Sequence, residues 1–170
     1  MSYYEQIKEL FISNEVYKKV KDYSKIRSEV DTYYNVGKLI IKAQEGKVRA
    51  IYGTNLIKEY SKKLINELDD KKYSYRNLMN MRKFYLVFRN EKVNALRSQL
   101  SWSHYRELIS IKNLDEIKYY VQIAEANNLS VRELRNRIKS KEYERLDSKT
   151  KEKLINKEDT LVSDFIKDPI

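Results

Sequence analysis

The fold is decided by the stretch Ala124-Glu125-Ala126-Asn127-Asn128-Leu129-Ser130-Val131-Arg132-Glu133-Leu134-Arg135-Asn136-Arg137-Ile138, which predicts two helices joined by a tight turn. Asn128 falls where the first helix must end in a left-handed residue, a conformation that Asn tolerates well. Ser130 is placed to cap the second helix, and Glu133, three residues later, completes a capping box. Leu134 and Ile138 then lie one turn apart, on the side expected to face the core. This spacing is typical of a helix-turn-helix.

The other side of the second helix is polar and basic. Arg and Asn side chains read base edges with paired hydrogen bonds, and Lys neutralises phosphates. The residues expected to bind nucleic acid here are Ser130, Arg132, Arg135, Asn136 and Lys139. The sequence therefore predicts a DNA-binding helix, with the solvated basic face of an ordinary helical hairpin as the alternative.

Composition favours a helical protein with an anionic partner. The chain has 170 residues, 41% of them hydrophobic, which is enough to build a core. Lys and Arg number 35 against 25 Asp and Glu, and the formal net charge of +10 favours nucleic acid over an anionic membrane surface. Three Gly and one Pro leave little material for β-hairpins, so an all-α fold is expected.

The sequence offers little for catalysis. There is no Cys, and the single histidine, His104, has no partners for a transition-metal site, so a capping or core role is expected for it. No phosphate-cradling Gly loop, nucleophile elbow or convergent carboxylate set occurs. We expect no enzyme activity, cofactor, metal or small-molecule substrate. The lack of a signal peptide and of a membrane-spanning apolar run predicts a cytoplasmic protein with no membrane partner.

Helical periodicity and turn signals divide the chain into four regions. We expect helices from about Tyr3 to Tyr23 and from Ile26 to Ala43, with Gly37 at a close contact with another helix. The predicted fold is a helical bundle with one or two helix-turn-helix (winged-helix-like) units. Its regions are a helical hairpin at 1–46, a possible first helix-turn-helix unit at 47–99, a second helix-turn-helix unit at 100–146, and a charged helical extension or linker to a further domain at 147–170.

The region 47–99 partly repeats the pattern of the opening stretch. A helix is expected at about Leu56–Asp69, followed by one capped by Ser74, with Lys72 at the position that corresponds to Asn128. Its predicted inward residues are Leu78, Met81, Tyr85 and Phe88, and its predicted nucleic-acid-binding residues are Arg76, Asn77, Asn80 and Lys83. One or two helix-turn-helix units are therefore expected.

In the region 100–146, Ser101 or Ser103 is expected to cap a helix that ends around Lys112, with Trp102 as a buried anchor. Asn113 is expected to cap the next helix, Leu114 to Ala126.

Five motifs follow one another in order between Ile26 and Leu146. They are Thr32-Tyr33-Tyr34-Asn35-Val36-Gly37-Lys38-Leu39-Ile40, Arg49-Ala50-Ile51-Tyr52-Gly53, Asn77-Leu78 through Met81-Arg82-Lys83-Phe84-Tyr85, Leu100-Ser101-Trp102-Ser103-His104, and Asn128-Leu129-Ser130-Val131-Arg132-Glu133-Leu134 with Tyr143-Glu144-Arg145-Leu146. Together these motifs resemble the N-terminal domain of the YhcG-like bacterial proteins. Tyr34 and Leu129 stand where the family commonly has Trp, and Lys72-Tyr73 replaces a Gly-containing turn.

The resemblance implies a nucleic-acid-recognition module. In full-length relatives this helical domain precedes a PD-(D/E)xK nuclease-like domain, and Asp168-Pro169 resembles the junction with it. The family supplies no catalytic residues for this half. The alternative function is a protein-interaction or dimerisation module, for which exposed Tyr residues and the C-terminal arm would form a homodimer or recruit a partner.

Overall fold

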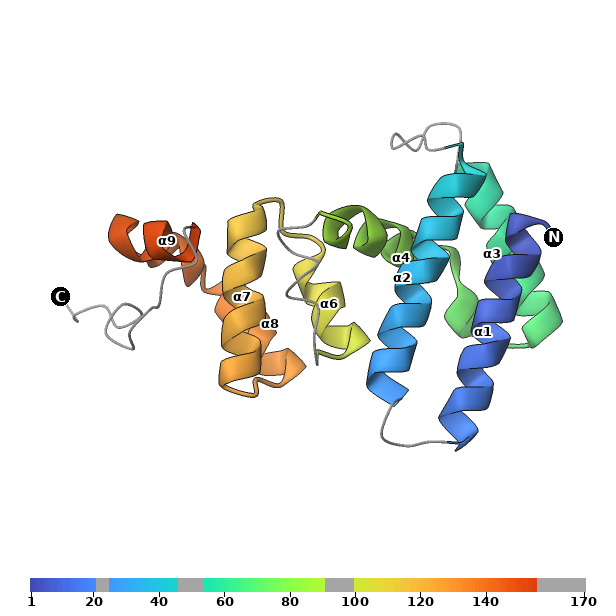
Figure 1. Cartoon of the computed structure of the whole chain (residues 1–170), viewed down its shortest axis with the longest axis horizontal. Coiled ribbons are helices and arrows are strands. Elements are labelled where there is room, and N and C mark those ends of the chain that lie inside the picture. The colour runs from blue at the N-terminus through green and yellow to red at the C-terminus, as the bar shows by residue number, and fades with distance from the viewer. Residues whose placement is uncertain (21–24, 46–53, 91–99, 156–170) are drawn as a thin grey trace. The chain divides into compact units, whose positions relative to one another are not determined.

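In the computed structural model (Figure 1), residues 1–20, 25–45, 54–90 and 100–155 are described. Their secondary structure is helical throughout, without a strand, which confirms the all-α prediction. No helix in these ranges is both long and apolar enough to cross a bilayer. Two compact units are present, Met1–Asn94 and Ala95–Ile170. The predicted motif at 49–53 and the junction at 168–169 lie outside the described residues.

The first unit contains α1 (Tyr3–Val20), α2 (Lys25–Ala43), α3 (Thr54–Leu68), the 3-10 helix η1 (Lys71–Tyr73) and α4 (Tyr75–Phe88). Figure 1 shows α1 and α2 side by side, and α2 also packs along α4. A Cβ built on Gly37 would lie 2.1 Å from the carbonyl oxygen of Met81. Because only glycine leaves room for that approach, the predicted close contact at Gly37 is confirmed, and its partner is α4.

The buried face of α4 differs in one residue from the predicted stripe. Phe84 is fully buried together with Leu78, Met81 and Phe88, whereas Tyr85 is half-buried. The Tyr85 ring packs edge-on against the ring of Tyr34 in α2, with 5.1 Å between the centroids. Tyr85 therefore lies on the flank of the α2–α4 contact, and the prediction that it faces inward like Phe88 is corrected.

The connection between α3 and α4 is not the tight turn that was predicted. Its left-handed residue is Asp69, at φ 50°, and not Lys72, which belongs to η1. The side chain of Asp70 accepts the N–H of Lys72 at 2.9 Å and begins η1 before Ser74 caps α4. The prediction that Lys72 corresponds to Asn128 is therefore wrong, because a 3-10 turn is inserted between the two helices.

The second unit contains α6 (Trp102–Leu108), α7 (Leu114–Ala126), α8 (Val131–Lys139), the 3-10 helix η2 (Tyr143–Arg145) and α9 (Ser148–Ile155). Its helices α6 and α8 pack together, and α7 packs on α8, η2 and α9 (Figure 1). Trp102 is 7% exposed, which confirms its role as an anchor. Helix α6 ends at Leu108 and not near Lys112, because Ile109 is already its C-terminal cap and a turn follows to Asn113.

Candidate nucleic-acid interface

The turn between α7 and α8 is held by backbone hydrogen bonds. The N–H of Leu129 donates to the carbonyl of Ala124 at 2.9 Å, and the N–H of Asn128 donates to that of Glu125 at 3.2 Å. With Asn128 at φ 48°, these bonds form a Schellman motif. The predicted left-handed role of Asn128 is confirmed.

The start of α8 is fixed by a reciprocal cap. Ser130 Oγ accepts the N–H of Glu133 at 3.2 Å, and Glu133 Oε2 accepts the N–H of Ser130 at 2.7 Å. The predicted capping box is confirmed. The N–H of Ser130 lowers the pKa of the Glu133 carboxyl below its usual range. The Ser130 oxygen, one of the predicted nucleic-acid-binding groups, thus serves as the cap of α8.

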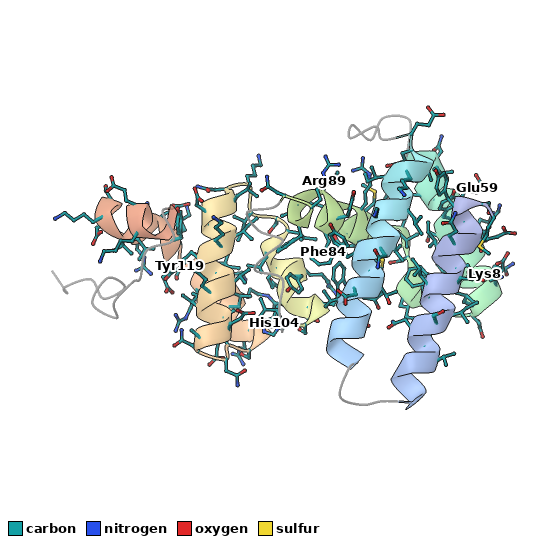
Figure 2. The ribbon with its side chains drawn as sticks, viewed as in Figure 1. Lys8, Glu59, Phe84, Arg89, His104 and Tyr119 are labelled. Carbon is teal, nitrogen blue, oxygen red and sulfur yellow. The ribbon has the colours of Figure 1, made fainter. Side chains whose placement is uncertain are left out.

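Helix α6 supports the same turn from a distant part of the sequence. Of the two predicted caps, Ser101 is the one that caps α6, and it forms a capping box with His104. His104, labelled in Figure 2, also reaches the turn: its Nε2 lies 2.8 Å from the carbonyl oxygen of Leu129. The predicted capping role of His104 is confirmed, and the contact with Leu129 adds a second role.

Helix α8 has one buried side and one exposed side. Leu134 is fully buried, and Val131 and Ile138 are half-buried beside it. Arg132 and Asn136 each lie two positions from Leu134, which on a 3.6-residue helix is the opposite side, and both are exposed. The exposed set on α8 consists of Arg132, Arg135, Asn136 and Lys139.

The arginines on the two flanks of α8 are held by carboxylates. Arg135 Nε and Nη2 lie 3.0 and 2.7 Å from Glu107 Oε1 on α6, and this contact raises the pKa of the guanidinium. Arg137 Nη1 lies 3.3 Å from Glu142 Oε1. By contrast, Arg132 and Lys139 form no ion pair within the described part of the chain. These two cations are therefore the ones available to an external anion.

The carboxylates that hold the arginines were not predicted from the sequence. Glu107 is 28 positions from Arg135, so no local spacing identifies the pair. Glu142 also accepts the hydroxyl of Tyr119 at 2.6 Å, and burial together with this carboxylate raises the pKa of Tyr119. Tyr119 (Figure 2) thus anchors Glu142 against α7.

The second predicted set lies on α4 in the first unit. Arg76 and Lys83 are exposed, whereas Asn80 is half-buried. Asn77 is half-buried as well, and its side-chain amide donates to the carbonyl of Lys72 at 2.8 Å. Asn77 therefore stabilises the turn before α4 instead of pointing to solvent as predicted. The structure places this set and the α8 set in different units.

The described residues contain no group of three or more His, Cys, Asp or Glu side chains that could hold a metal ion.

The sequence model of the family called DUF1016 N-terminal domain matches residues 12–145. The chain belongs to this family. The DUF1016 match includes α6, α7 and α8 and thus the whole of the interface above.

One relative of this DUF1016 domain is described as "Putative nuclease YhcG" of Escherichia coli strain K12. It is 29% identical over 145 residues, and the match covers 67% of the present chain. It covers only 38% of the relative, so the chain corresponds to well under half of that protein. No solved structure matches the chain.

Proposed function

We propose that the chain is a DNA-binding module of a nuclease-family protein, non-catalytic by itself, and that α8 is its reading helix within a helix-turn-helix. The observation that carries the proposal is the exposed side of α8, where Arg132 and Lys139 have no ion-pair partner among the described residues. Asn136 lies between them on the same side. The Asn136 amide can form two hydrogen bonds with a base edge, and the two cations beside it can bind phosphates.

The supporting helices give this side a fixed orientation. The Schellman turn at Asn128, the capping box at Ser130 and the contact between His104 and Leu129 hold α8 at its first turn. A reading helix needs such support, because base contacts depend on placement within about 0.5 Å. A nucleic-acid partner also agrees with the name "Putative nuclease" of the Escherichia coli relative.

A protein-interaction or dimerisation module is the second candidate. Ile12 and Val16, one turn apart on α1, are 43% and 56% exposed. Neighbouring exposed apolar side chains favour a protein contact over solvent. A homodimer or a recruited partner would cover them.

Titration of a labelled random duplex at two salt concentrations tests the DNA-binding proposal. Binding that weakens as salt rises, with a slope of about −0.9 in log K against log salt for each phosphate contact, is the expected result. Light scattering on the same sample reports the oligomer. A dimer that does not bind DNA would favour the second candidate.

A further inference from the structure

The net positive charge of the chain is concentrated in the first unit. Residues 1–94 contain 20 Lys and Arg against 12 Asp and Glu, whereas residues 95–170 contain 15 against 13. The unit with α8 is thus nearly neutral. Long-range attraction of a polyanion must therefore come mainly from the other unit.

A groove lies on that first unit, between α3 and the start of α4. Its volume is about 930 Å³, and its lining includes Lys58, Lys62 and Asn66 of α3 and Tyr75 of α4. Tyr75 is half-buried, while the three α3 residues are exposed. The groove therefore combines an aromatic ring with basic and amide side chains.

The charges of the groove favour an anion. Of its two acidic residues, Glu59 (Figure 2) is engaged by Lys63, whose Nζ lies 3.4 Å from Glu59 Oε1, and the other is Asp69. Lys58 and Lys62 form no ion pair within the described residues. Lys58 Nζ instead lies 5.7 Å from the centroid of the Tyr75 ring. A weak cation–π contact of this kind leaves the ammonium available to a phosphate.

We propose that this groove binds a single-stranded stretch of nucleic acid, with one base stacked on Tyr75 and neighbouring phosphates bound by Lys58 and Lys62. Aromatic rings beside backbone-binding cations are the usual components of single-strand sites, because every base presents a face for stacking. A paired base cannot stack on a side chain in this way, so the occupant is an unpaired strand. This site extends the proposed DNA-binding function to a second nucleic-acid structure, and it does not depend on α8.

The test measures binding of a fluorescein-labelled oligothymidylate of about a dozen nucleotides, a length within the site sizes of single-strand binders. The first variant is Lys58→Gln with Lys62→Gln. Its matched control is Lys38→Gln with Lys42→Gln, which removes the same charge from exposed positions of α2 in the same unit. The second variant is Tyr75→Leu, and Tyr75→Phe is its control because it keeps the ring. Thermal melts verify that all four variants fold.

The groove pair is expected to bind the oligonucleotide about tenfold more weakly, with the salt slope reduced by about 0.7 for each phosphate that the variant no longer neutralises. The α2 pair is expected to keep the wild-type slope. Tyr75→Leu should lose at least about fivefold in affinity, the lower range for one stacked base, whereas Tyr75→Phe keeps the wild-type value.

Three results would overturn the proposal that the groove binds a single strand. They are a wild type that does not bind the oligonucleotide at low salt, equal reductions in affinity for the two lysine pairs, and equal affinities of Tyr75→Leu and Tyr75→Phe. Duplex binding reports α8 separately, since Arg132→Ala with Lys139→Ala should weaken duplex binding while leaving the oligonucleotide bound. If the wild type binds the oligonucleotide but no duplex, the proposed duplex binding by α8 is rejected and the proposed single-strand site in the groove is retained.

Discussion

The imidazole Nε2 of His104 lies 2.8 Å from the carbonyl oxygen of Leu129, which joins α6 to the turn before α8. The other ring nitrogen, Nδ1, accepts the N–H of Ser101 at 3.3 Å. Since Nδ1 is an acceptor, Nε2 carries the hydrogen and donates it to Leu129. One histidine thus closes the first turn of α6 and orients the turn that presents α8.

The first prediction is that His104→Ala destabilises the second unit by about 1–2 kcal/mol, because the buried segment at Leu129 loses a hydrogen-bond donor and α6 loses half of its capping box. Urea denaturation measures the free energy of unfolding. Ser103→Ala, at the exposed position beside it, is the control and should match the wild type. Equal stabilities of His104→Ala and wild type would mean that the contact contributes nothing.

The second prediction concerns Asn128, which has φ 48°. Asn128→Gly should be neutral or slightly stabilising, whereas Asn128→Val should destabilise by about 1–2 kcal/mol because a β-branched residue is strained in the left-handed region. Gln122→Val, at an exposed position of α7, controls for the lower helix propensity of Val and should cost a few tenths of a kcal/mol. Melting temperatures that are equal for Asn128→Val and Gln122→Val would contradict the left-handed turn.

The third prediction is that Gly37→Ala destabilises the first unit by about 2 kcal/mol or more. Alanine gains about 1 kcal/mol of helix propensity over glycine, but its Cβ would lie 2.1 Å from a backbone oxygen at Met81 that cannot move without shifting α4. Asn35→Ala, exposed on the same helix, should instead be slightly stabilising. Thermal unfolding compares the two, and a stabilised Gly37→Ala would rule out the close contact of α2 and α4.

The fourth prediction is a pH dependence at Glu133. Because the folded-state pKa of Glu133 is lowered, its stabilisation is present above the ordinary Glu value of about 4.3 and is lost as the pH falls through the folded value. The difference in melting temperature between wild type and Glu133→Ala should therefore be largest at neutral pH and shrink below about pH 4. The control Glu133→Gln does not titrate, so its difference from Glu133→Ala should not vary with pH. A constant difference for the wild type would show that the charge of the Glu133 carboxylate adds nothing to its bond with the Ser130 N–H.

Features encoded within a few residues were predictable, and features that depend on tertiary contacts were not. The caps at Ser74, Asn113 and Ser130 and the left-handed Asn128 follow from spacing, because capping partners are two or three positions away. The same local reasoning failed between α3 and α4, where Asp70 begins a 3-10 turn that has no counterpart in the turn between α7 and α8.

The candidate site follows the same division. That Arg132, Asn136 and Lys139 are exposed follows from helical periodicity around Leu134. The pairing of Arg135 with Glu107 does not, since it depends on how α6 packs against α8. The sequence predicts five nucleic-acid-binding residues at α8. In the structure two of them are available cations, one is an exposed amide, one is an arginine paired with Glu107, and Ser130 caps the helix.

The last prediction uses this difference between the cations of α8. Arg132→Ala with Lys139→Ala should weaken duplex binding and reduce the salt slope by about 0.9 for each phosphate that the variant no longer neutralises. Both side chains point away from Leu134, and Ala favours a helix, so the core should be unaffected. If Arg132 reads a guanine, the affinity should instead fall by about 1–3 kcal/mol on the preferred sequence and by less on a random duplex.

Glu107→Gln should act in the opposite direction. It removes the carboxylate that holds Arg135, at 2.7 Å from Nη2, and so adds a third available cation to the exposed side of α8. Tighter duplex binding with a steeper salt slope is expected. Glu152→Gln, which makes the same charge change at an exposed position of α9, separates this from a general electrostatic effect and should change the slope little. If Glu107→Gln behaves like Glu152→Gln, and the double alanine variant binds duplex as the wild type does, then α8 is not the reading helix and the protein-interaction function takes its place.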